Sequence, residues 1–92
     1  MTFNITQKHI DAGDTSMGYC PIALAVTEAL GDNAYVLVDY KTIYIGDYGE
    51  STGLKKGKSY NLPSSAIAWI ATHDAKFPGT TPKPFSFELE IA

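Results

Sequence analysis

The sequence predicts a two-layer α+β fold in which two helices pack on one face of a mainly antiparallel sheet. Three observations predict this class. Residues 85–91 alternate apolar and polar side chains, as in a strand with one buried and one exposed face. Residues 35–40 and 42–47 are rich in β-branched and aromatic side chains. Helical patterns begin at Pro21 and Pro63. Two helices and a sheet can bury their apolar faces against each other as two layers around one core.

The N-terminal part predicts an edge strand, an irregular connection and the first helix. Phe3 and Ile5 alternate with polar residues, which indicates a short strand. Residues 7–19 are rich in glycine and aspartate and are expected to be irregular. Pro21 suits the first helical position because its missing N–H is no loss there, and Gly31 suits the end. The expected buried face of this helix consists of Ile22, Ala25, Val26, Ala29 and Leu30.

The middle of the chain predicts an antiparallel strand pair followed by a polar loop. The pair is expected to turn near Tyr40 and Lys41. Its inner face is expected to hold Val36, Val38, Ile43 and Ile45. Residues 47–59 contain three glycines and three lysines, which predicts a mobile loop.

The last third predicts a brief strand, the second helix and the final strand. The brief strand covers residues 60–62, and the helix then runs from Pro63 to near Asp74. Its buried stripe is expected to contain Ala66, Ile67, Ile70 and Ala71. Prolines at 78, 82 and 84 exclude regular structure between this helix and the final strand.

Length and charge restrict the classes of function. With 92 residues, the sequence predicts one compact domain over residues 1–92, with a small core. The net charge is −3 and every basic residue is a lysine, which argues against sequence-specific DNA binding, because arginine supplies the usual base contacts. Cys20 is the only cysteine, which fits a reducing compartment. No stretch resembles a signal peptide or a membrane span, so no membrane association is expected.

The sequence contains no legible catalytic, cofactor or metal site. Residues 53–59 look like a phosphate-binding loop, but Thr52 stands where the motif needs its first glycine. Nothing in the spacing places His9 or His73 beside Cys20 as a catalytic pair. One cysteine and two distant histidines also match no zinc pattern. We therefore expect a protein that is not an enzyme and that needs no cofactor or metal.

A small domain without such a site is expected to act through its surface. Lysines can contact phosphates, and flanking tyrosines can stack on exposed bases. Exposed carboxylates can steer association with a basic protein. The candidate partner-binding residues are Lys55, Lys56, Lys58, Tyr48, Tyr60, Asp47, Glu88 and Glu90.

Several segments resemble a family of short phage and prophage proteins. The resemblance covers His9-Ile10, the run from Cys20 to Ala25, Leu62-Pro63 and the run from Pro84 to Leu89. Within this family, the chain is similar to phage anti-CRISPR inhibitors of the type I-F system. The resemblance implies a protein that binds the multi-subunit Cas surveillance complex, reaches its guide RNA and blocks target DNA hybridisation. We expect a monomer, located in the host bacterial cytoplasm. The matching motifs are mainly structural, so they assign no binding residue by position.

The alternative is a small phage regulatory or ligand-sequestering protein of unknown partner. A regulator of this kind would be stabilised by its ligand in the absence of any Cas protein. An inhibitor would instead co-elute with the surveillance complex.

Overall fold

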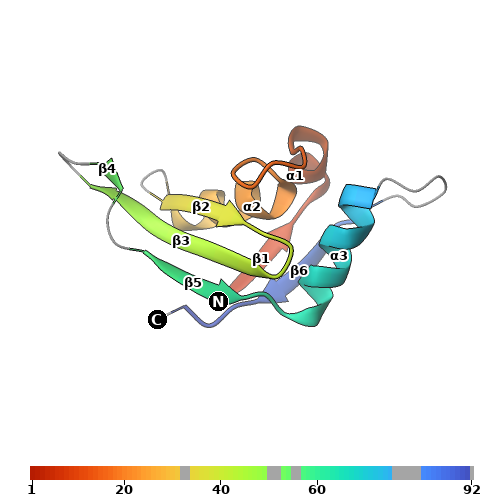
Figure 1. Cartoon of the computed structure of the whole chain (residues 1–92). Coiled ribbons are helices and arrows are strands. Elements are labelled where there is room, and N and C mark those ends of the chain that lie inside the picture. Colours follow the sequence, from red (N-terminus) through yellow and green to blue (C-terminus); the bar gives the residue numbers. More distant parts are fainter. Residues whose placement is uncertain (32–33, 50–52, 55–56, 76–81, 92) are drawn as a thin grey trace.

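In the residues that it describes, the computed structural model contains three helices and two antiparallel sheets around one core (Figure 1). The structure describes residues 1–31, 34–49, 53–54, 57–75 and 82–91. The predicted α+β class is confirmed. Two details differ from the prediction, because the strands divide between two sheets and a third, short helix is present.

The first sheet joins the two ends of the described chain. Strand β1 (Thr2–Ile5) pairs with β6 (Phe85–Glu88), which places Phe3 opposite Phe87. Both side chains are buried, and their ring centres lie 5.6 Å apart. The alternating pattern that predicted these strands therefore corresponds to a real buried face.

The second sheet has the strand order β2–β3–β5. Strand β2 (Ala34–Val38) pairs with β3 (Thr42–Gly49), and β3 pairs on its other side with β5 (Lys58–Asn61). A two-residue strand, β4 (Gly53–Leu54), pairs with the end of β3 at the end of the molecule farthest from α3 (Figure 1). The predicted pairing is confirmed, with these inner-face partners: Val36 opposite Ile45 and Val38 opposite Ile43.

The prediction of a continuous loop over residues 47–59 is wrong in part. Strand β3 continues to Gly49, and β5 already begins at Lys58. Glycine and lysine are not typical strand residues, so the composition of this segment did not predict strands. The strands form because β3 pairs with β4 and β5.

Helix α1 (Gln7–Ala12) occupies a segment that was expected to be irregular. The backbone N–H of Thr6 donates a hydrogen bond to Nδ1 of His9 over 3.0 Å. This contact is the reciprocal half of a capping box, in which an imidazole replaces the usual glutamate or glutamine. The prediction failed here because the cap does not use the residue types of the common pattern.

Helix α2 (Pro21–Leu30) begins and ends where the sequence predicts. Cys20 is the N-cap residue, and its Sγ accepts a hydrogen bond from the N–H of Ala23 over 3.4 Å. The helix contacts both β1 and β2. Its buried face is therefore wider than predicted and also includes Ala23. Ala29 was expected in this face but is exposed, next to the exposed Glu28.

Helix α3 (Ser64–Ala75) follows Leu62 and Pro63, as predicted. Over residues 64–73, its buried residues are Ala66, Ile70 and His73, which are spaced by four and three positions along the helix. Ile67 is half-buried. Ala71 is exposed, so its expected place in the buried stripe is wrong, because the core-facing stripe is centred on Ile70 and not between Ile70 and Ala71.

Candidate binding surface

The segment 14–19 between α1 and α2 forms a closed loop, called the 14–19 loop below. The N–H of Asp14 donates to the carbonyl of Tyr19 over 2.9 Å and closes it. The carboxylate of Asp14 accepts the N–H of Ser16 over 2.8 Å, as in an Asx-turn. The carbonyl of Met17 accepts the N–H of Val38 over 2.8 Å. These bonds close the loop and attach it to the outer edge of β2.

Exposed apolar side chains gather at this loop. Met17 is 49% exposed and Tyr19 is 67% exposed, and Tyr40 in the neighbouring β2–β3 turn is 64% exposed. Among the described residues, Met1 is the other large hydrophobic side chain with this degree of exposure. Single exposed apolar residues are common, but a group of them indicates a contact surface.

Two hollows lie beside the 14–19 loop. The first, called the edge hollow below, has a volume of about 380 Å³. It is lined by Ser16, Gly18, Tyr19, Thr27, Ala34, Tyr35, Val36 and Leu37. The second, called the turn hollow, has a volume of about 200 Å³. It is lined by Thr15, Ser16, Met17, Cys20, Val38, Asp39, Tyr40, Trp69 and Ile70. The loop therefore separates two depressions that a partner could fill.

A row of aromatic rings leads away from the turn hollow. Trp69 stacks on Phe85 at 4.9 Å and on His73 at 5.2 Å between ring centres. The indole N–H of Trp69 donates to the carbonyl of Lys83 over 2.7 Å. These contacts fix the half-buried Trp69 as one rigid wall of the turn hollow.

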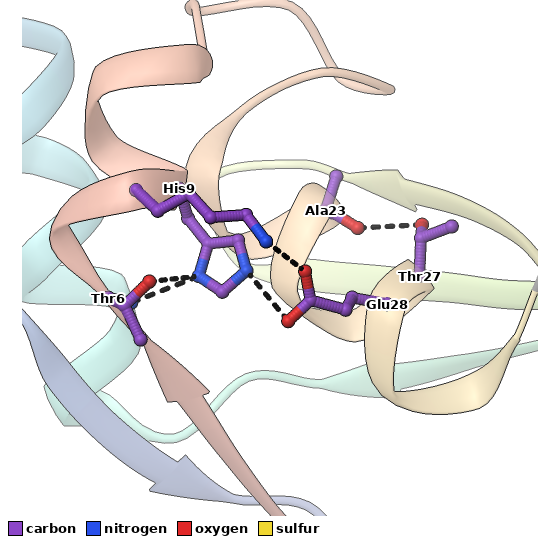
Figure 2. A network of polar contacts seen from close by, with 6 residues as sticks. Thr6, His9, Ala23, Thr27 and Glu28 are labelled. Atoms are coloured by element: carbon purple, nitrogen blue, oxygen red, sulfur yellow. Dashed lines mark hydrogen bonds and ion pairs between the residues drawn. The ribbon is translucent and has the colours of Figure 1, made fainter.

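A polar network joins α1 to α2 (Figure 2). Nζ of Lys8 lies 3.0 Å from Oε2 of Glu28, and Nε2 of the buried His9 lies 3.4 Å from Oε1. The His9 contact does not meet hydrogen-bond geometry, so it is electrostatic in character and depends on the protonation of the ring. Lys8 holds the pKa of Glu28 below its ordinary value of 4.5 by a hydrogen bond and by its charge, and His9 acts in the same direction.

The variant Glu28→Gln is expected to make the protein less sensitive to acid. Because folding lowers the pKa of Glu28, its contribution to stability is complete above pH 4.5 and is lost as the pH falls through the lowered pKa. The difference in urea midpoint between wild type and variant is therefore expected to be small at neutral pH and to vanish in acid. In a Lys8→Met background the same difference should be reduced at neutral pH, because Lys8 is the main cause of the lowered pKa of Glu28. A difference that grows in acid would contradict this assignment.

The predicted partner-binding residues fall into two groups. Four of them share the second sheet: Asp47 and Tyr48 on β3, and Lys58 and Tyr60 on β5. Lys58 is exposed, and its Nζ lies 5.7 Å from the ring centre of the half-buried Tyr60. On β3, Asp47 lies opposite Ala34 of β2 and Tyr48 lies opposite Leu54 of β4. Lys55 and Lys56 lie outside the described residues.

The two predicted glutamates belong to the first sheet. Glu88 is exposed on β6, where Oε1 accepts a hydrogen bond from the hydroxyl of Thr2 over 3.0 Å. Glu90 is exposed beyond the end of β6. Strand pairing therefore joins the four residues of the second sheet but does not join them to the glutamates.

The residues that the sequence prediction missed are those of the 14–19 loop and its surroundings. Met17, Tyr19 and Tyr40 were not named as candidates, because the sequence alone does not show which apolar residues of a connection or turn are exposed. One sequence signal could have indicated this surface. Met17 and Tyr19 are large side chains in a glycine-rich segment that was expected to be irregular.

Two kinds of feature are not found in the described part of the chain. No group of three or more histidine, cysteine, aspartate or glutamate side chains there could hold a metal ion. No helix in the described ranges is long and apolar enough to cross a membrane.

Comparison of this chain with protein-family models, with curated proteins and with solved structures finds no match.

Proposed function

We propose that this protein is a phage-encoded anti-CRISPR inhibitor of the type I-F Cas surveillance complex. In this role it binds the ribonucleoprotein, contacts the guide RNA and blocks target DNA hybridisation by occupying the space of the target strand. The observation that carries the proposal is the resemblance of residues 20–25, 62–63 and 84–89 to the family described above. In the fold these residues cap and begin α2, precede α3 and form β6, so they maintain the framework and leave other surfaces for binding.

The exposed surface supports a role in protein binding. Met17, Tyr19 and Tyr40 present apolar area around two hollows, and aromatic side chains are enriched at protein interfaces. Lys58 supports contact with RNA, since its exposed ammonium group can meet a phosphate. Occlusion of this kind requires a stable shape and a complementary surface, and it requires no chemical step.

The proposal is tested with the purified protein and a reconstituted type I-F surveillance complex. We expect the two to co-elute in size-exclusion chromatography, and we expect the bound complex to lose binding of a matched target DNA in a gel-shift assay. Separate elution would contradict the proposal. Stabilisation by a small molecule in a thermal-shift screen, together with separate elution, would favour the alternative of a ligand-sequestering protein.

Reversing three charges at once tests the lysine contacts. The variant Lys55→Glu, Lys56→Glu, Lys58→Glu is expected to bind the surveillance complex at least about tenfold more weakly, because long-range attraction to the guide RNA is lost. Affinity is measured by surface plasmon resonance at two salt concentrations. The control reverses Lys8 and Lys83, two exposed lysines outside the second sheet and the 14–19 loop. Inhibition by the triple variant at wild-type strength would exclude these lysines as contacts.

A further inference from the structure

Strand β2 is an outer strand of the second sheet, so one side of its backbone faces away from β3. In an antiparallel pair, hydrogen-bonded and non-hydrogen-bonded residue pairs alternate. The N–H of Asp39 donates to the carbonyl of Thr42 over 2.8 Å, which fixes this alternation. It follows that the backbone groups of Val36, three positions earlier, point outward and not toward β3.

The outward N–H groups on either side of Val36 already have partners. The N–H of Val38 donates to the carbonyl of Met17, and the N–H of Ala34 donates to the carbonyl of Gly31 over 3.0 Å. Among the described residues, no backbone partner outside the ladder with β3 is found for the N–H or the carbonyl of Val36. Val36 also lines the edge hollow. The N–H and the carbonyl of Val36 therefore lie beside the edge hollow. They are spaced as in any strand residue that pairs with a neighbouring strand.

We infer that β2 accepts an extended polypeptide segment of a partner protein as an added strand at Val36. In antiparallel addition, one residue of the segment exchanges both backbone hydrogen bonds with Val36, donating to its carbonyl and accepting from its N–H. A side chain of the segment then enters the edge hollow. Nucleic acid cannot provide this alternating backbone pattern, so the occupant is a peptide.

The hollow defines the side chain that it accepts. Among the described residues that line it, none carries a charge, and the apolar residues Ala34, Val36 and Leu37 belong to this lining. A charged side chain would lose hydration there without an ion-pair partner. The segment therefore places an uncharged, aliphatic side chain in the hollow.

A second copy of this chain does not fit the same edge. If two β2 strands paired around a twofold axis at Val36, Ala34 of one copy would lie opposite Val38 of the other. That position is occupied by Met17, whose carbonyl is bonded to the N–H of Val38. A short segment that pairs at Val36 and then leaves the edge avoids this clash.

This inference goes beyond the proposed function and does not rest on it, because it identifies the kind of segment that one edge accepts from any protein partner. Its test therefore uses no surveillance complex. A display library of random short peptides is selected against the purified protein, and the enriched peptides are synthesised. Amide hydrogen exchange is then measured by NMR for the free protein and for each complex.

We expect the amide of Val36 to exchange faster than those of Tyr35 and Leu37 in the free protein, because these two belong to hydrogen-bonded pairs with β3. A bound peptide is expected to slow exchange at Val36 at least about tenfold. The variant Gly18→Leu fills the edge hollow, since a Cβ at this position already lies 3.7 Å from Leu37, and it should abolish peptide binding. The control Ser86→Ala changes an exposed residue of β6, outside both hollows, and should retain binding.

Three results would overturn the inference. The first is failure to enrich any peptide, and the second is enrichment of peptides that protect other amides but not Val36. The third is concentration-dependent self-association of the free protein with protection at Val36, which would make a second copy the occupant. The variant Val36→Pro lacks this N–H and, with a folded spectrum, is expected to lose peptide binding. Wild-type binding by the folded variant would also overturn the inference.

Discussion

Replacement of Phe3 by alanine is expected to lower the free energy of unfolding by about 3–5 kcal/mol. Phe3 is 1% exposed, and its ring lies against Phe87 on the opposite strand. The change leaves a cavity in the core between β1 and the helices, and a small domain has only about 5–15 kcal/mol in total. Urea denaturation followed by circular dichroism measures the effect.

The matched control for Phe3 is Asn4→Ala on the same strand. Asn4 is exposed, and its side-chain oxygen accepts a hydrogen bond from the hydroxyl of Ser86 over 2.6 Å. Loss of this exposed bond is expected to cost no more than about 1 kcal/mol. Equal losses in the two variants would contradict the place of Phe3 at the centre of the core.

Replacement of Gly13 by alanine is expected to destabilise the protein by about 1–3 kcal/mol. A Cβ at this position would lie 2.7 Å from both the backbone nitrogen and Cδ of Pro21. The proline ring cannot rotate away, and Pro21 is buried at the start of α2. The variant must therefore shift the junction between the two helices, which thermal and urea unfolding will detect.

Gly18→Ala is the matched control, because it adds the same methyl group at the opposite end of the 14–19 loop. Its nearest neighbour would be Cδ2 of Leu37 at 3.7 Å, an ordinary contact distance. We expect no loss of stability, and a gain of up to about 1 kcal/mol from a stiffer unfolded chain is consistent with the space available. A larger loss at Gly18 than at Gly13 would show that these contacts do not determine the outcome.

The elements predicted correctly are those in which local signals agree with tertiary packing. In β6, the alternation of Phe85 and Phe87 with polar residues matches the burial found. In α2, Pro21 and Gly31 mark both ends. The elements that were missed depend on contacts that no local pattern contains. Helix α1 relies on the side chain of His9 as a cap partner, and the division into two sheets depends on pairing between distant strands.

The candidate surface was harder to predict than the fold. Tyrosine is amphipathic, so its presence does not reveal its exposure. Tyr35, Tyr44 and Tyr60 are half-buried on the second sheet, whereas Tyr19 and Tyr40 are exposed beside the 14–19 loop. This difference follows from which face each strand presents and from the bond between Met17 and Val38, and both are properties of the assembled molecule.

The pairing of β1 with β6 has a consequence for how the protein folds. Thr2 lies opposite Glu88, so the first sheet joins segments that are almost the full chain apart. Such a topology has a high contact order, and the entropy of closing so long a chain segment slows folding relative to helical domains of similar length. During synthesis, β1 therefore has no partner strand until β6 has left the ribosome.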